Sequence, residues 1–195
     1  MNNHFLVVID MQNDFINGSL GSADAQKILP RVIKKIMNHH GPIIATVDTH
    51  DSDYDMTLEG RLLPVAHCIE NSDGWEINKE VAAAMISQGN YIGFVKKNTF
   101  GSVDLPAVIM EHIEACKNVA INNPNVKMVN SSALPPEFTI IGLDTDICVI
   151  SNALILRAAF PNSKITIDSH CCAGTSYKAH RCALETAKSC QINVE

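Results

Sequence analysis

The stretch HFLVVID, residues 4–10, is an apolar, β-rich run that ends in a carboxylic acid. An unbroken apolar run of this length is typical of a strand that is covered on both faces in a parallel sheet. The run PIIATVDTH, residues 42–50, has the same character. Between the two, residues 24–41 (DAQKILPRVIKKIMNHHG) have apolar positions at helical spacing, and Gly41 is the expected stop of that helix. The three segments together predict one βαβ unit.

The alternation of strand and helix patterns continues to the end of the chain. Further strands are expected at YIGFVKK (91–97), EFTIIGL (137–143) and KITIDSH (164–170). The last residues, INVE (192–195), are a candidate edge strand. Helices are expected within residues 75–90 and at 105–115. The pattern predicts an α/β fold, a three-layer doubly wound and mainly parallel sheet with helices on both faces. No Pro-, Gly- or Ser-rich linker interrupts it, so residues 1–195 are expected to form a single domain.

Composition restricts the class of partner. Apolar residues make up 46% and charged residues 18% of the 195 residues, and the formal net charge is −6 without a basic cluster. This charge argues against nucleic acid and an anionic membrane surface, so we expect a small-molecule partner. The first residues carry too short an apolar run for a secretory signal, and we expect a cytoplasmic protein. Seven cysteines without a CxxC pair predict reduced thiols, most of them in the core.

The carboxyl ends of the strands are the first place to look for a site, because ligands of open α/β sheets bind there. The residues that follow the expected strands are Asp10, 48–50, Lys96 and Lys97, 144–148 and 168–172. The first turn reads DMQNDF where dinucleotide-binding proteins have G-x-G-x-x-G, and no Walker sequence is present. A nicotinamide- or flavin-dependent oxidoreductase is therefore not expected.

The segment GLDTDICV, residues 142–149, places Cys148 between an expected strand and an expected helix. In the first turn of a helix, backbone N–H groups and the helix dipole lower the pKa of a thiol and can hold an oxyanion. A lysine at the end of a neighbouring strand favours the thiolate further, and Asp10 can move the thiol proton to a leaving amine. This set suits acyl transfer. Taken singly, however, a cysteine more often belongs to the core, an aspartate to a cap and a lysine to the surface.

A second group of polar residues lies in and after the run DTH. Side chains repeat every two residues along a strand, so Asp48 and His50 point to the same side and can bind one ion, with His67 closing the site from the long loop. One oxygen and two imidazole ligands suit Zn²⁺ or a similar divalent ion, and ordinary hydrogen bonding in the loop is the alternative. Three further acids in that loop add either a ligand or only charge: Asp51, Asp53 and Asp55.

Seven segments that span almost the whole chain in order carry a resemblance to a known family: VVIDMQNDFINGSL, IIATVDTHDSDY, LPVAHCIENSDGW, FVKKNTF, IIGLDTDICV, ITIDSHCCAG and ALETAKSCQINVE. The sequence resembles the isochorismatase-like cysteine hydrolases, and within them the nicotinamidase branch. The resemblance implies an Asp–Lys–Cys triad at Asp10, Lys97 and Cys148. Lys97 is preferred to Lys96 because the aromatic residue that follows the family's lysine corresponds to Phe100.

Further roles follow from the same resemblance. It implies three ligands for a divalent metal, Asp48, His50 and His67. It also implies a cis peptide bond between Leu143 and Asp144, which would let the backbone amides of Asp144 and Cys148 form an oxyanion hole. Phe15 is expected to form part of the substrate pocket.

The activity that the resemblance implies is cysteine-dependent hydrolysis of a small amide. Nicotinamide would give nicotinate and ammonia through a thioester acyl-enzyme, with Zn²⁺ orienting the substrate, and we also expect a homo-oligomer. The alternative is an isochorismatase-family hydrolase that acts on another small amide or on a C–O bond. A binding domain that keeps the fold without catalysis is a third interpretation.

Three departures from the nicotinamidase pattern bear on the substrate. The tryptophan that commonly precedes the second metal histidine is replaced by LLPVA, and Trp75 lies on the other side of that histidine. Asp144 stands where a small residue is usual, and its carboxylate would either repel an acidic substrate or turn outward. Residues 116–136 form a longer connection than expected, which suits a lid, an oligomer contact or a solvated insertion.

Overall fold

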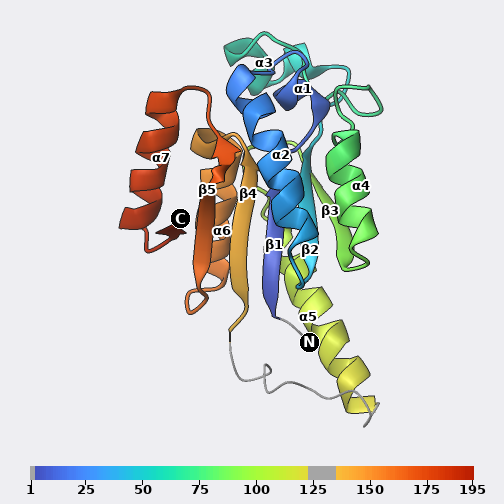
Figure 1. The fold of residues 1–195 in the computed structure, drawn as a ribbon. Helices are drawn as coiled ribbons and strands as arrows, with labels where there is room; N and C mark the ends of the chain where they lie inside the picture. The colour runs from blue at the N-terminus through green and yellow to red at the C-terminus, as the bar shows by residue number, and fades with distance from the viewer. Residues whose placement is uncertain (1–2, 123–134) are drawn as a thin grey trace.

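The computed structural model describes residues 3–122 and 135–195, and over these residues the chain forms a sheet between two layers of helices (Figure 1). The strands are β1 (His4–Ile9), β2 (Ile43–Asp48), β3 (Tyr91–Lys97), β4 (Glu137–Leu143), β5 (Ile165–Ala173) and β6 (Asn193–Val194). Their order in the sheet is β3-β2-β1-β4-β5-β6, and each neighbouring pair is parallel. The predicted three-layer doubly wound α/β fold is therefore confirmed, including the short edge strand near the C-terminus.

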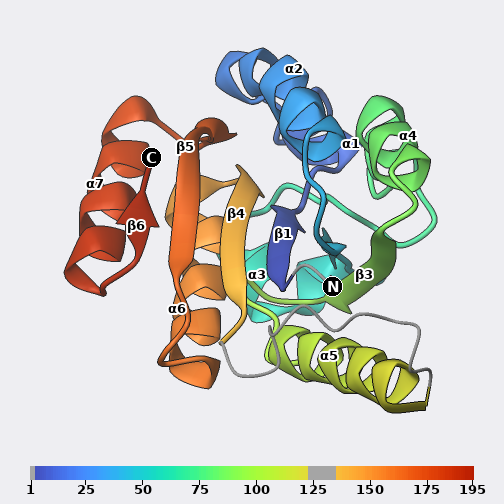
Figure 2. The same ribbon diagram turned by 60° about the horizontal axis from the view of Figure 1, so that its bottom comes forward.

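Helices cover both faces of the sheet (Figure 2). They are α1 (Asn13–Ile16), α2 (Ala23–Met37), the 3₁₀ turn η1 (Tyr54–Met56), α3 (Leu58–Leu62), α4 (Lys79–Ser87), α5 (Leu105–Asn122), the π-helical turn η3 (Thr145–Val149), α6 (Ile150–Ala159) and α7 (Tyr177–Ser189). Residues of α1, α2 and α4 form one core cluster with the sheet, and residues of α5, α6 and α7 form the other.

The alternation of side chains along β1 divides this strand between the two core clusters. Phe5, Val7 and Ile9 pack under α5 and α6, whereas Leu6 and Val8 face α2. All five are buried, and burial of an aliphatic or aromatic side chain of this size stabilises the fold by about 1.5–3 kcal/mol. The unbroken apolar run of the sequence thus results from two buried faces.

The expected stop of α2 at Gly41 is wrong. The helix ends at Met37, and Asn38 is its C-cap residue. Gly41 instead lies against the start of β1, where a Cβ atom would come within 1.9 Å of the His4 carbonyl oxygen. The glycine is needed for this close approach of the two backbones and not for a helix stop.

Strand β5 is longer than its sequence pattern predicts. The strand was expected at residues 164–170, but it continues to Ala173, so that residues 171 and 172, expected just after it, lie within it. A shift of register between Ile140 and Gly142 lets the strand continue, so that Cys172 pairs with Gly142. The consequence is that Cys171 and Cys172 are buried core residues.

Helix α5 also continues beyond its expected end at residue 115, to Asn122. The first part of the connection at 116–136 is therefore helical, and residues 123–134, to which the expectation of a lid, an oligomer contact or an insertion also applied, lie outside the described residues. Within residues 3–122 and 135–195, no helix is both long and apolar enough to cross a membrane. The single domain and the homo-oligomer stay predictions.

Candidate active site

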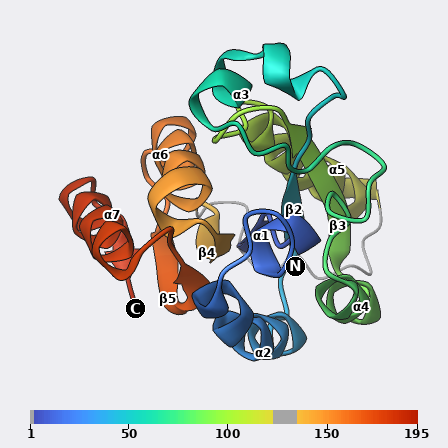
Figure 3. The same cartoon turned by 90° about the horizontal axis from the view of Figure 1, so that it is seen from above.

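The carboxyl ends of four neighbouring strands meet at one edge of the sheet, which faces the viewer in Figure 3. Asp10 directly follows β1, Asp48 ends β2, Lys97 ends β3, and Cys148 lies in the turn after β4. The chain leaves β1 toward β2 and later returns beside it as β4, so the topological switch point of the sheet lies between β1 and β4. This is where open α/β sheets bind their ligands.

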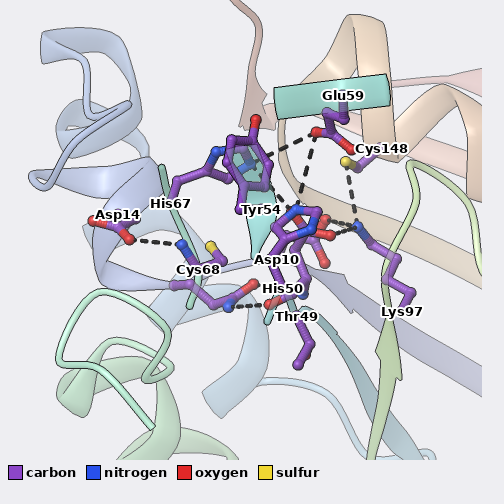
Figure 4. Close-up of polar contacts among 12 residues, drawn as sticks. Asp10, Asp14, Thr49, His50, Tyr54, Glu59, His67, Cys68, Lys97 and Cys148 are labelled. Carbon is purple, nitrogen blue, oxygen red and sulfur yellow. Dashed lines mark hydrogen bonds and ion pairs between the residues drawn. The ribbon is translucent and has the colours of Figure 1, made fainter. Parts of the chain in front are cut away.

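Lys97 lies at the centre of this group (Figure 4). Its Nζ atom is 2.7 Å from Asp10 Oδ2 and 3.1 Å from Asp48 Oδ1, and it donates to the Cys148 sulfur over 3.5 Å. The Thr46 hydroxyl donates to the other oxygen of Asp10 over 2.6 Å. The three residues expected as a triad are therefore brought together, with the side chains of Asp10 and Lys97 almost fully buried.

Burial and charge act in opposite directions on the two ionisable members of this pair. Burial raises the pKa of Asp10, and the ammonium group of Lys97 limits that rise. Burial alone would lower the pKa of Lys97, but the charges of Asp10 and Asp48, joined by that of Cys148 when it is a thiolate, outweigh it and raise the pKa above its usual value. Lys97 therefore stays a cation, and Asp10 can hold or release a proton.

The expected lowering of the Cys148 thiol pKa is not found. Burial raises this pKa well above its usual value, the charge of Asp10 raises it further, and the opposing effect of Lys97 is smaller. The physical reason is desolvation, because a buried thiolate lacks the water that would stabilise its charge. In the resting site Cys148 is thus a thiol.

The turn that holds Cys148 is shaped by its neighbours in the sheet. Cys148 lies in the π-helical turn η3, and the Asp144 carbonyl accepts hydrogen bonds from the amides of Ile147 and Val149. The peptide bond between Leu143 and Asp144 is cis, as the resemblance implies. Asp144 and Cys148, the two residues expected to supply oxyanion-hole amides, therefore lie four positions apart in one tight turn.

The three expected metal ligands also converge. Suitable ligand atoms of Asp48, His50 and His67 lie within 4.8 Å of one another, and all three residues are buried. His67 Nδ1 is 2.8 Å from the Val65 carbonyl oxygen, which leaves Nε2 directed at the cluster. Bonds of Asp48 to the two histidines hold its pKa well below the usual range, although burial alone would raise it. Its carboxylate is thus ionised, as metal binding requires.

Glu59 on α3 is a fourth member of this cluster that sequence reasoning missed. Its Oε1 atom lies 3.7 Å from His67 Nε2 and 4.0 Å from His50 Nε2 (Figure 4). The only signal in the sequence was an acid within the long loop. The acids considered there instead, Asp51, Asp53 and Asp55, are exposed and are not among the residues of the cluster.

The spacing of Asp48, His50 and His67 fits three ligand positions of a tetrahedral ion. Metal bonds of about 2.0–2.1 Å place tetrahedral ligand atoms roughly 3.3 Å apart. Asp48 Oδ2 lies 3.2 Å from His50 Nε2 and 3.5 Å from His67 Nε2. Glu59 lies farther out, 4.0 Å and 3.7 Å from the same two histidine atoms, beside the group of three. The residues present therefore fit a divalent cation.

Gln12 fixes the backbone of Asp48, and sequence reasoning missed this role too. The Gln12 side chain accepts from the Asp48 amide over 2.7 Å and donates to the Asp48 carbonyl over 2.8 Å. It also donates to the Trp75 carbonyl. Because Gln12 is fully buried, these bonds hold Asp48 between Lys97 and the histidines.

The remaining expected residues lie around the cluster. The Phe15 ring is buried and its centre is 5.6 Å from that of His67, so it is placed to form a wall beside the histidines. Lys96 points away from the site, where it pairs with Glu70 and lies over the Trp75 ring. Trp75 donates its indole N–H to Thr49, so its polar edge is directed at the end of β2.

Asp144 lies half-buried at the edge of the site. Burial, together with the negative charges of Asp146 and Asp10, raises its pKa to about 7. A carboxyl group that had turned fully into solvent would not feel this desolvation. Asp144 therefore changes its charge near neutral pH.

Comparison with known proteins identifies the family. The model of the isochorismatase domain matches residues 4–114, which is more than half of the chain. The chain belongs to the isochorismatase family. The matched range contains Asp10, Asp48, His50, His67 and Lys97, and it ends before Cys148. No curated protein sequence matches this family member significantly.

Solved structures of the same fold extend over the whole of this isochorismatase-family chain. A nicotinamidase/pyrazinamidase from Bacillus subtilis is 24% identical, with a TM-score of 0.76 and coverage of 100% of this chain and 99% of the other. A pyrazinamidase from Pyrococcus horikoshii in complex with zinc is 22% identical, with a TM-score of 0.69 and coverage of 99% and 98%. An N-carbamoylsarcosine amidase from Thermoplasma acidophilum is 20% identical, with a TM-score of 0.67 and coverage of 100% and 96%.

Proposed function

We propose that the protein is a cysteine-dependent amidohydrolase that converts nicotinamide to nicotinate and ammonia. The observation that carries the proposal is the buried contact of Lys97 Nζ with Asp10 and with the Cys148 sulfur. A cation between a proton acceptor and a thiol is an arrangement that serves nucleophilic catalysis and has no obvious use in a binding domain. The nicotinamidases and amidases among the structures of similar fold support the choice of a C–N bond.

Acylation begins with a proton transfer. The buried carboxylate of Asp10 accepts the thiol proton of Cys148, and Lys97 stabilises the thiolate that results. The sulfur attacks the amide carbonyl carbon, and the carbonyl oxygen becomes an oxyanion that backbone amides of Asp144 and Cys148 hold. When the C–N bond breaks, Asp10 gives its proton to the leaving nitrogen, and ammonia departs.

Deacylation repeats the same roles with water. Asp10, now a carboxylate again, takes a proton from a water molecule whose oxygen attacks the thioester carbonyl. The C–S bond breaks, the carboxylic acid is released, and the proton on Asp10 returns to the Cys148 sulfur. Lys97 remains a cation throughout, because its raised pKa opposes loss of its proton.

Asp48, His50, His67 and Glu59 are the residues that would hold a divalent metal, with Zn²⁺ as the proposed ion. Two imidazoles and two carboxylates form a ligand set that zinc accepts. When bound, the ion supplies a Lewis-acid point that fixes a substrate atom such as a pyridine nitrogen. Phe15 lies beside His67 and is proposed to line the pocket for the substrate ring.

A second candidate is hydrolysis of a different small amide or of a C–O bond by the same triad. Asp144 supports this second candidate, because its carboxyl group lies near the turn that holds Cys148. When ionised, it disfavours substrates that carry a negative charge. The requirement for metal separates the candidates, since only the nicotinamidase type depends on the histidine cluster. Loss of amide hydrolysis in His67→Ala supports nicotinamide as the substrate. Full activity of metal-free His67→Ala supports the second candidate.

Ammonia release from a panel of small amides tests the triad. For the purified, zinc-supplemented protein we expect Cys148→Ala to lower kcat for the best amide by about 10³-fold or more, because the nucleophile is removed. Cys182→Ala is the matched control, since this exposed thiol lies on α7 and its loss leaves the site intact. A Cys148→Ala protein as active as the control would rule out the proposed nucleophile.

A further inference from the structure

Lys97 and the Cys148 turn come from strands that are not neighbours. In the sheet, β2 and β1 lie between β3, which ends at Lys97, and β4, which precedes Cys148. The ladders of the sheet therefore relate the two residues only through two intervening strands. Contacts outside the sheet can join them more directly and so affect the 3.5 Å approach of Lys97 Nζ to the Cys148 sulfur.

Asn152 on α6 supplies such contacts. Its side-chain N–H groups donate to the Cys148 carbonyl over 2.8 Å and to the Phe100 carbonyl over 3.2 Å, and its carbonyl oxygen accepts from the Ser102 amide over 3.0 Å. Asn152 is fully buried and Ser102 is almost so. Both functional atoms of the amide are thus used to join the nucleophile turn to the segment that follows β3.

The backbone of that segment lies directly on α6. At Gly101, between the two residues that Asn152 binds, a Cβ atom would come within 2.5 Å of Ile155 Cδ1 and 3.2 Å of Ser151 Cβ. A methyl group at this position would have to displace the end of the Ile155 side chain and would press against Ser151, so the segment and the helix are in tight contact here. The glycine and the buried amide together form a clasp, which we define as Phe100, Gly101 and Ser102 bound to Asn152.

We propose that Asn152 is a positioning residue that sets the spacing between Lys97 and Cys148 through this clasp. Only two residues separate Lys97 from Phe100, so the place of the Phe100 carbonyl limits where β3 can end. Without the Asn152 amide, three backbone groups lose a partner, two of them in buried bonds, and the segment moves from α6. The inference rests on the proposed function, since it assigns a catalytic reason for that spacing.

Two substitutions at Asn152 separate the two halves of the clasp. Asn152→Ala removes all three bonds; we expect kcat for nicotinamide to fall by roughly 10- to 100-fold while KM changes by less than about threefold, because misplacement affects the reacting groups more than substrate binding. Asn152→Asp keeps an acceptor for Ser102 but loses both donors. We expect the same fall in kcat, with the Ser102 amide still protected from hydrogen exchange.

Ser151→Ala is the matched control. The Ser151 hydroxyl donates to the Ile147 carbonyl over 2.6 Å, so this variant also removes a bond between α6 and the turn, but it leaves the clasp intact. We expect its kcat to stay within about threefold of the wild-type value. Gly101→Ala loosens the clasp from the other side without altering Asn152, and it keeps the test decisive if Asn152→Ala does not fold.

Hydrogen exchange of the Ser102 amide measures whether the clasp is intact, independently of catalysis. In Asn152→Ala and Gly101→Ala we expect the Ser102 amide to exchange at least about tenfold faster, with the sheet amides unchanged. Wild-type exchange at Ser102 in both variants, or a kcat in both variants equal to that of Ser151→Ala, overturns the proposal. If the wild-type protein hydrolyses no amide, the proposed function fails, and unchanged exchange at Ser102 separately rejects the clasp.

Discussion

Asp144 is the residue whose charge is most sensitive to conditions near neutral pH. Burial raises the pKa of its carboxyl group from 3.8 to about 7, with Asp146 and Asp10 adding to the effect. The folded protein therefore keeps this proton to a higher pH than the unfolded chain does. Between about pH 4 and pH 7 unfolding releases the proton, so the stability that this group contributes at low pH is lost as pH rises through 7.

Asp144→Asn is expected to remove this pH dependence. One pKa unit corresponds to about 1.4 kcal/mol, and with partial solvent screening we expect the variant to gain on the order of 2 kcal/mol relative to wild type between pH 4.5 and pH 8. Urea unfolding at the two pH values measures the change. Asp73→Asn is the control, because this acid is exposed and is not among the charges that act on Asp144. A constant difference between Asp144→Asn and wild type across this range would contradict the pKa.

At the residue scale, the sequence predicts which polar groups lie at strand ends, but not how far each group is buried from solvent. Asp10, Asp48 and Lys97 each stand at the end of an apolar run, so the rule that parallel strands end together is enough to place them side by side. The raised pKa of Cys148 was not foreseen, because it depends on how completely α6 and the sheet exclude water. Glu59 was missed because no strand positions it.

At the scale of elements, β4 reaches the site only because Gly142 is its next-to-last residue. Gly142 has a φ of 123°, and a Cβ atom there would come within 2.0 Å of the Ile9 carbonyl oxygen on β1. Residues other than glycine rarely adopt this φ, and the contact with Ile9 leaves no room for a Cβ atom. The glycine thus lets β4 lie against β1 at the point where Asp10 and the Cys148 turn begin.

Gly142→Ala is therefore expected to lower the free energy of unfolding by at least about 3 kcal/mol, through strain and a backbone clash together. Gly89→Ala is the control, because Gly89 also has a positive φ, of 68°, but has no atom within 4 Å of a built Cβ. Its loss should be about 1–2 kcal/mol. If urea unfolding gives the same loss of unfolding free energy for both variants, the predicted clash with Ile9 does not destabilise the protein.

Strand positions were easier to predict than helix ends. The bounds of β3 and β4 agree with their apolar runs, since both begin and end with the pattern. Helix α5 continues seven residues beyond its expected end, because residues 116–122 carry no stop signal that the pattern could detect. The predicted helix end at Gly41 was wrong, because a close approach of two backbones requires glycine as strongly as a helix end does.

At the scale of the molecule, the cluster of proposed metal ligands connects the sheet to the segment that covers it. Asp48 and His50 belong to β2 and its end, whereas Glu59 and His67 come from the segment between β2 and α4. An ion bound to both parts would hold that segment on the sheet. Ligand binding stabilises the folded state by about 2.7 kcal/mol at a free concentration one hundred times the Kd.

We expect zinc to raise the urea midpoint of the protein and a chelator to reverse the effect. Glu59→Gln should weaken zinc binding by about 10- to 100-fold, as loss of a ligating or orienting carboxylate does in metal sites. Asp55→Asn, an exposed acid of the same segment, is the control and should keep the wild-type Kd. Calorimetry with zinc alone measures both, and equal Kd values for the two variants would remove Glu59 from the site.

The position of β1 has a consequence for synthesis on the ribosome. β1 is made first, yet one of its two neighbours in the sheet is β4, which begins at Glu137. At about 5–20 residues per second, translation of the roughly 130 residues between them takes about 6–26 s. During that time the nascent chain exposes an apolar strand edge of the kind that aggregates. Chaperones that bind nascent chains are therefore expected to engage this protein until residue 143 has left the ribosome.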